Sequence, residues 1–132
     1  DLNGAGGDIL ERVRAFFEKK TTEAEQRGVN KNRLCFDPGI GFGKTNEENF
    51  ALIANPEKIR VPGTALLMAA SRKRVIGAVC GNPPFEDRMA GTVAAHTASV
   101  LFGADMVRAH DTFEAVQAAR VADAIKQFRK GV

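Results

Sequence analysis

The stretch TALLMAASRKR, residues 64–74, decides the fold, because a largely apolar run of seven residues is followed at once by four polar ones. An apolar run of this length without alternation is typical of a strand buried on both faces, as in a parallel sheet. The polar cluster leads into VIGAVCG, residues 75–81, which predicts a short helix. The stretch therefore predicts a buried strand with polar side chains at its carboxyl end.

The same pattern occurs on both sides of this stretch. Upstream, RLCF (residues 33–36) is a short apolar run that stops at Asp37-Pro38-Gly39. Downstream, DMVRAHD (residues 105–111) predicts a third strand, which ends with Arg108 and His110. Period-two alternation would place Arg108 and His110 on one side of that strand, where one anion could touch both.

Helical patterns separate these strands. Asp8 is a good N-cap for an amphipathic helix that Gly28 ends, and Thr45 is a good N-cap for NEENFALIAN, residues 46–55. Residues 85–102 predict a helix rich in small residues, and residues 112–128 predict a final helix. The alternation predicts an α/β fold with a parallel sheet and no hairpin.

Composition indicates one globular domain, residues 1–132, with 44% hydrophobic and 27% charged residues. The net charge of +3 suits small anionic ligands and falls short of the basic stripe of a nucleic-acid-binding protein. No apolar run is long enough to span a membrane, and no secretory pattern opens the sequence. Cys35 and Cys80 lack metal or disulfide spacing, so a cytoplasmic location is expected. The opening DLNGAGGD is typical of a loop end, which suggests a fragment.

The glycine-rich segment FDPGIGFGKT, residues 36–45, raises the question of phosphate binding. A P-loop would need glycine where Pro38 stands, and a dinucleotide fingerprint would need glycine where Asn46 stands. The segment therefore binds something else or only turns the chain, since glycine reaches positive φ without steric cost.

Several polar residues have an ordinary structural interpretation when each is taken alone. Asp37 could cap the Pro-Gly turn, and Ser71 could cap a helix that begins in SRKR. For His96, inside the small-residue helix, packing or surface exposure is favoured over ligation, and the helix itself could form a subunit interface. The convergence of five side chains at the carboxyl edge of a parallel sheet nevertheless favours a binding site made of Asp37, Ser71, Lys73, Arg108 and His110.

Taken together, LCFDPGIGFGKTNEENFALI, LLMAASRKRVIG and MVRAHD closely resemble the second half of the dihydropteroate synthase family. The resemblance spans nearly the whole chain, with three motifs in order. It implies the last three strands of a (β/α)₈ barrel. It also implies a transferase of folate biosynthesis, in which p-aminobenzoate displaces diphosphate from dihydropterin hydroxymethyl diphosphate to give dihydropteroate.

The resemblance also implies roles for residues of this chain. Asp37 matches the carboxylate that hydrogen-bonds the pterin ring. Lys73 matches a lysine that contacts the pterin and borders the aminobenzoate pocket, and Phe42 matches the loop aromatic at that pocket. Arg108 and His110 match the pair at the pterin face and the diphosphate site. Together with Ser71, these residues form the expected substrate-binding set, with Lys73, Arg108 and His110 as the catalytic residues.

Other features of the family are expected outside this chain. The resemblance implies Mg²⁺, but its ligand asparagine, a second pterin-binding aspartate and the catalytic loops belong to the first half of the barrel, and no metal ligand is assigned here. It also implies a homodimer through the last helices. The family often has glycine before SRK, where this chain has Ala69 or Ala70, and serine after it, where this chain has Arg74. These differences bear on the binding of aminobenzoate and of its sulfonamide mimics.

Two alternatives remain open. The chain could be a non-catalytic half-barrel, because three parallel strands cannot close a barrel and leave edges that invite pairing with another copy. It could also come from a related pterin-binding barrel that transfers methyl groups, although such a protein has no evident need for the anion-binding set of Ser71, Lys73, Arg108 and His110. In either case the isolated chain is expected to be inactive.

Overall fold

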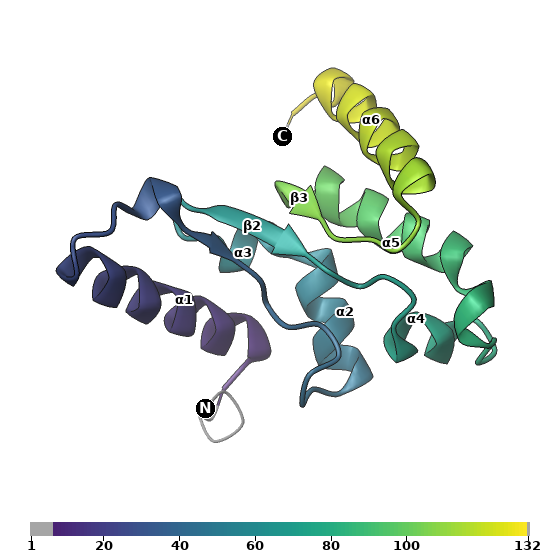
Figure 1. Ribbon diagram of the computed structural model, residues 1–132, viewed down its shortest axis with the longest axis horizontal. Coiled ribbons are helices and arrows are strands. Elements are labelled where there is room, and N and C mark those ends of the chain that lie inside the picture. The colour runs from purple at the N-terminus through teal and green to yellow at the C-terminus, as the bar shows by residue number, and fades with distance from the viewer. Residues whose placement is uncertain (1–6, 132) are drawn as a thin grey trace.

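The computed structural model describes residues 7–131, so the first six residues of the glycine-rich opening lie outside the described part. Nine elements follow one another along the chain (Figure 1). They are α1 (Ile9–Gln26), β1 (Cys35–Phe36), α2 (Asn46–Ala54), α3 (Pro56–Ile59), β2 (Ala65–Met68), α4 (Arg74–Val79), α5 (Met89–Leu101), β3 (Met106–Val107) and α6 (Thr112–Phe128). Two short 3₁₀ helices, Lys31–Arg33 and Phe85–Asp87, precede β1 and α5.

Two helices begin where the sequence predicts. The side chain of Asp8 accepts a hydrogen bond from the Leu10 N–H at the start of α1. At α2, the Thr45 hydroxyl accepts from the Glu48 N–H while the Glu48 carboxylate accepts from the Thr45 N–H, which is a complete capping box. These bonds satisfy amide groups that the first turn of a helix leaves without partners.

The three strands form one parallel sheet in the order β1-β2-β3. Cys35 pairs with Ala65 and Phe36 with Leu66, while Leu67 pairs with Met106 and Met68 with Val107. The predicted α/β architecture with parallel strands is therefore confirmed. The parallel arrangement brings the carboxyl ends of all three strands to one edge.

Only one face of the sheet is covered by described residues, which corrects the expectation of strands buried on both faces. Phe36, Leu66, Met68 and Val107 share the face that packs into the core with the helices. On the opposite face Cys35 and Met106 are exposed, and their sulfur atoms lie 3.9 Å apart. A closed barrel would bury this second face, and its absence explains why apolar strand residues here meet solvent.

The helices pack in two groups. α1 contacts α2 and α3 beside β1, whereas α5 packs against α6 beside β3 and also contacts α2 and α4 (Figure 1). The core lies between these helices and the covered face of the sheet, with Val13, Ile40, Leu52, Ile59 and Met68 fully buried. This packing fixes the strands and leaves their carboxyl ends accessible.

Several boundaries differ from the sequence expectations. The predicted strands 33–36, 64–70 and 105–111 shorten to two, four and two residues. The first loses its amino-terminal end, where a 3₁₀ helix covers residues 31–33, and the other two are shortened mainly at their carboxyl ends. The predicted helix 85–102 is split, with a 3₁₀ turn at residues 85–87 and α5 beginning at Met89. Helix α3, which begins with Pro56 at a favourable first position, was not predicted. Within residues 7–131, no helix is long and apolar enough to cross a membrane.

Candidate functional site

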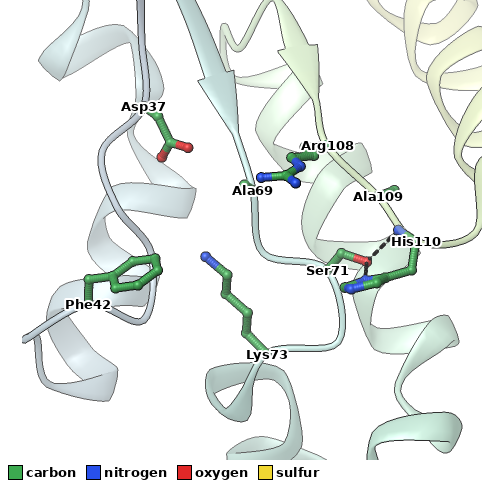
Figure 2. A pocket seen from close by; sticks show the side chains of 8 residues that line it. All are labelled: Asp37, Phe42, Ala69, Ser71, Lys73, Arg108, Ala109 and His110. Carbon is green, nitrogen blue, oxygen red and sulfur yellow. Dashed lines mark hydrogen bonds between the residues drawn. The ribbon is translucent and has the colours of Figure 1, made fainter.

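A pocket of about 370 Å³ opens at the carboxyl ends of the three strands. All six residues predicted for substrate binding line it (Figure 2). The full lining is Asp37, Phe42, Ala69, Ser71, Lys73, Arg108, Ala109 and His110. The structure thus brings together side chains from three segments that lie up to 73 positions apart in the sequence, from Asp37 to His110.

Asp37 caps the turn after β1 and also lies at the edge of the sheet that forms the pocket. Its Oδ1 accepts a hydrogen bond of 2.8 Å from the Gly39 N–H, which closes the turn after β1. Its carboxylate also points into the pocket (Figure 2). A carboxylate has acceptor sites for several donors, so the turn leaves capacity for a ligand's N–H groups.

The glycine-rich loop after β1 forms one side of the pocket. Gly39, Gly41 and Gly43 all have positive φ, between 63° and 87°, which side-chain-bearing residues rarely adopt. Lys44 donates from Nζ to the carbonyl oxygens of Gly39 and Phe42, at 2.8 and 3.0 Å. From the sequence, Lys44 was interpreted only as a charged residue near the start of a helix. In the structure, its hydrogen bonds hold the loop in place.

Phe42 and Lys73 face each other across the pocket. The Phe42 ring is 72% exposed, and the Lys73 Nζ lies 4.9 Å from its centroid. That Nζ also donates to the Ile40 carbonyl at 2.5 Å, which links the loop after β2 to the loop after β1. Burial lowers the pKa of Lys73; the negative charge of Asp37 opposes this effect, and Arg108 adds to it.

Ser71 and His110 form a hydrogen-bonded pair between β2 and β3 (Figure 2). The Ser71 Oγ lies 2.7 Å from His110 Nδ1 and also accepts from the His110 backbone N–H at 3.0 Å. This bond occupies Nδ1 and leaves Nε2 as the ring nitrogen open to a ligand. An Nε2–H donor is suited to an anionic oxygen. Ser71 is not the helix cap considered from the sequence, because α4 begins at Arg74.

Alternation along a strand does not place Arg108 and His110 in the pocket, which corrects the sequence expectation, because both residues follow the end of β3. β3 ends at Val107, and the Arg108 N–H makes the last bond of the edge, to the Met68 carbonyl. The chain then leaves the strand, so Arg108, Ala109 and His110 all line the pocket. Figure 2 shows the Arg108 guanidinium directed toward the middle of the pocket.

Two neighbouring basic residues lie outside the pocket lining. Arg72 forms a two-pronged ion pair with Asp111, with bonds of 3.0 and 2.6 Å. Arg74 is exposed at the start of α4. Of the cluster SRKR, therefore, Ser71 and Lys73 line the pocket.

The arrangement combines groups suited to bind an anion with groups suited to bind a flat ligand that donates hydrogen bonds. Lys73, Arg108 and His110 supply cationic or N–H donors on one side, while Asp37 supplies acceptors on the other and Phe42 supplies an aromatic edge. Residues 7–131 contain no group of three His, Cys, Asp or Glu side chains that could hold a metal ion. Asp37 is the one acidic residue among the described residues that line the pocket.

Comparison with known proteins places residues 2–110 in the family described as "Pterin binding enzyme". A dihydropteroate synthase of Synechocystis sp. is 37% identical over 119 residues, which is 90% of this chain and 41% of that enzyme. A dihydropteroate synthase of Clostridium beijerinckii is 42% identical over 119 residues, which is 89% of this chain and 44% of that enzyme. The chain spans less than half the length of the curated relatives it matches.

Solved structures agree with these relatives. The dihydropteroate synthase of Xanthomonas albilineans with 4-aminobenzoic acid superposes with a TM-score of 0.87 at 36% identity, over 95% of this chain and 46% of that one. The Burkholderia cenocepacia enzyme complexed with 7,8-dihydropteroate gives a TM-score of 0.86 at 36% identity, over 93% and 46%. The expectation that the chain has the fold of part of a (β/α)₈ barrel is confirmed.

Proposed function

The chain belongs to the family of pterin-binding enzymes, and on that premise we propose that it supplies half of the active site of a dihydropteroate synthase, residues 1–132 forming one partial barrel domain. One observation carries the proposal. The side chains that the resemblance assigns to pterin, aminobenzoate and diphosphate line a single pocket at the carboxyl edge of the sheet. This edge is where (β/α)₈ barrels build their active sites.

The proposed reaction joins two small molecules. The amine nitrogen of p-aminobenzoate attacks the methylene carbon of dihydropterin hydroxymethyl diphosphate, and the bond from that carbon to the diphosphate oxygen breaks. The electron pair leaves with the diphosphate, and the nitrogen loses a proton. Charge therefore grows on the leaving group, and the site must stabilise it there.

Asp37 and Phe42 are proposed to position the two ring systems. The Asp37 carboxylate points into the pocket, where it can accept hydrogen bonds from adjacent N–H groups of a pterin. Phe42, on the glycine-rich loop, offers an exposed ring to the aminobenzoate side. The solved Burkholderia and Xanthomonas enzymes, named as complexes with 7,8-dihydropteroate and 4-aminobenzoic acid, support the same ligand classes for this chain.

Lys73, Arg108 and His110 are proposed as the catalytic residues. The Arg108 guanidinium supplies fixed positive charge for a diphosphate oxygen. His110 offers Nε2 to the diphosphate, because Ser71 occupies its Nδ1. Lys73, held by the Ile40 carbonyl, lies between the Phe42 ring and the strand edge and can contact both the pterin and the aminobenzoate.

The resemblance also implies Mg²⁺, which when bound would neutralise diphosphate charge. The described residues do not fit a magnesium site by themselves, since one carboxylate, Asp37, lines the pocket and Mg²⁺ prefers several oxygen ligands. We propose that the ligands of the metal come from the rest of the barrel. The proposed partners are the small-molecule substrates, the remaining half of the barrel and a second copy of the protein. The proposed location is the cytoplasm, where the free thiols of Cys35 and Cys80 are stable.

The direct test is an assay of diphosphate release and dihydropteroate formation. We expect no product from the 132-residue chain alone and product from a protein in which the chain is joined to the remaining strands of its barrel. Product from the isolated chain would contradict the need for a second half. An inactive complete barrel would contradict the proposed function, and methyl transfer by it would favour the other class of pterin-binding barrel.

Asp37→Asn in the complete barrel tests the pterin role. Asparagine keeps the shape and can still accept from the Gly39 N–H, but it replaces one acceptor oxygen by a donor. We expect the affinity for 7,8-dihydropteroate, measured by calorimetry, to fall about 10- to 100-fold, the value of a hydrogen bond to a charged group. The matched control is Glu47→Gln, on an exposed carboxylate in the first turn of α2. Equal affinities of both variants would show that Asp37 does not bind the pterin.

A further inference from the structure

Residues 70–73, in the loop between β2 and α4, carry two of the pocket side chains, Ser71 and Lys73. Between them Arg72 has a φ of 55°, in the left-handed region. A side-chain-bearing residue in this region costs about 1 kcal/mol or more, so surrounding contacts must hold it there. The loop conformation that aims Ser71 and Lys73 at the pocket is therefore not the one the isolated loop would prefer.

One stripe of side chains along α5 supplies the contacts. Arg88, Thr92 and His96 are spaced four residues apart, which places them on one face of the helix. The His96 Nε2 accepts from the Ala70 N–H at 3.1 Å, and the Thr92 Oγ1 accepts from the Arg72 N–H at 2.8 Å. Arg88 donates to the Arg72 carbonyl at 3.0 Å.

The two side chains that accept these N–H groups are buried, and the Ala70–His96 bond is buried as a whole. Thr92 and His96 are each 4% exposed, and Ala70 is completely buried. An N–H group left without an acceptor in such a place loses a hydrogen bond that solvent does not restore. The Arg88 side chain passes over α4 at Gly77, where an added Cβ would lie 3.0 Å from the guanidinium Nε.

Resting on the proposed function, we propose that Thr92 and His96 are positioning residues of the site: they hold the Arg72 and Ala70 N–H groups and so fix the directions of Ser71 and Lys73. The effect extends to His110, because Ser71 bonds both its Nδ1 and its backbone N–H. Neither Thr92 nor His96 lines the pocket that holds the proposed catalytic residues. Their influence passes through the loop backbone.

The most specific variant is Thr92→Val, which keeps the shape of the side chain and removes the hydroxyl oxygen that accepts from the Arg72 N–H. Thr92→Ser keeps the hydroxyl and should restore the contact. Ser99→Ala is the matched control, because Ser99 is also buried on α5 and donates to the Ile53 carbonyl, away from the loop. All variants are made in the complete barrel and compared by amide NMR shifts and hydrogen exchange without ligand.

We expect Thr92→Val to speed exchange of the Arg72 amide and to shift the amides of Ser71, Lys73 and His110. Thr92→Ser should leave these signals near wild type, and Ser99→Ala should leave the loop unchanged. In the dihydropteroate assay, we expect kcat/KM to fall about 10- to 100-fold for Thr92→Val, the cost of a small misplacement of catalytic groups. For Thr92→Ser and Ser99→Ala the change should stay within about twofold.

Each outcome decides a separate point. If Thr92→Val leaves the loop amides and kcat/KM unchanged, or if Ser99→Ala perturbs them equally, the positioning role is wrong. If the loop amides respond as expected but no barrel, wild type included, makes dihydropteroate, the proposed function has failed while the loop contact stands. If the amides move and kcat/KM does not, the contact is structural and the positioning role is overturned.

Discussion

At the scale of single residues, His96 is the best example of a side chain whose role depends on its surroundings. It is buried beneath the loop, where its Nε2 accepts the Ala70 N–H. Acceptance requires that Nε2 carry no proton, so the imidazole is neutral with its proton on Nδ1. Burial, assisted by the positive charge of Lys73, lowers the pKa of His96 to about 4.

This pKa predicts a specific dependence of stability on pH. The unfolded histidine titrates near 6.5 and the folded one near 4, so between these values the unfolded state binds more protons. The stabilisation is fully present above pH 6.5 and is lost as the pH falls toward 4, by about 3 kcal/mol. Lys73 and Asp111 are the charged groups that face this position, one from the loop and one from the segment before α6.

Urea unfolding of wild type and His96→Gln at pH 7 and pH 4.5 measures the effect. Glutamine can accept from the Ala70 N–H and does not titrate, so we expect the difference in unfolding free energy between the two proteins to change with pH. The carboxylates that also titrate in this range are common to both proteins and cancel in the comparison. A difference that is the same at both pH values would contradict the neutral, buried state of His96.

At the scale of elements, α5 is the helix that supports the site. Its loop-facing stripe holds residues 70–72, and its small residues allow α4 and α6 to approach closely. At Gly91 an added Cβ would lie only 2.5 Å from the Ile76 Cγ2, a distance that real Cβ atoms do not reach. Gly91 is therefore required by packing between α4 and α5, and its φ is not in the left-handed region.

Gly91→Ala tests this packing. On an open helix the substitution would stabilise by about 1 kcal/mol through helix propensity. Here the clash with buried Ile76 should dominate and destabilise by about 1–3 kcal/mol, as overpacking does. Thermal or urea unfolding measures the change, and Ile76→Leu, which lacks the second γ-carbon, should recover part of it. A stabilised Gly91→Ala protein would show that α4 and α5 are less closely packed than described.

At the scale of the whole molecule, the apolar surfaces that meet solvent among residues 7–131 include two on or beside the sheet and α6. The first is the open face of the sheet around Met106. The second is the outer face of α6, defined by Phe113, Val116, Val121, Ile125 and Phe128, in which the terminal phenylalanines are 71% and 77% exposed. The opposite face of α6 carries small residues such as Ala122 and packs on α5. Contiguous exposed apolar side chains of this kind are typical of surfaces that bind another protein surface.

We therefore expect the chain to self-associate through the outer face of α6. Sedimentation equilibrium should give a mass above that of a monomer at high concentration, because burial of these side chains offsets the entropy of association. Ile125→Glu should shift the equilibrium toward monomer, while Gln26→Glu, a similar charge at an exposed position of α1, should have a much smaller effect. A strictly monomeric wild-type mass at every concentration would contradict this expectation.

The sequence alone determined the order of the helices and strands other than α3, and most of the candidate site. Capping residues Asp8 and Thr45 located two helix starts, and apolar runs located three parallel strands, because caps and hydrophobic runs are local properties of the chain. Asp37, Lys73 and His110 could be assigned to one edge because parallel strands place their carboxyl ends together. The motifs then indicated the family, in agreement with the comparisons.

Only the tertiary structure decided which of these side chains face the pocket and what supports them. Arg72 and Lys73 are neighbours in sequence, yet one pairs with Asp111 and the other lines the pocket, because a single left-handed residue turns the loop. The support from Thr92 and His96 joins residues 20 and 26 positions apart, and no local pattern reports such a contact. Long-range hydrogen bonds and packing arise from the path of the folded chain, so they are absent from any local reading of the sequence.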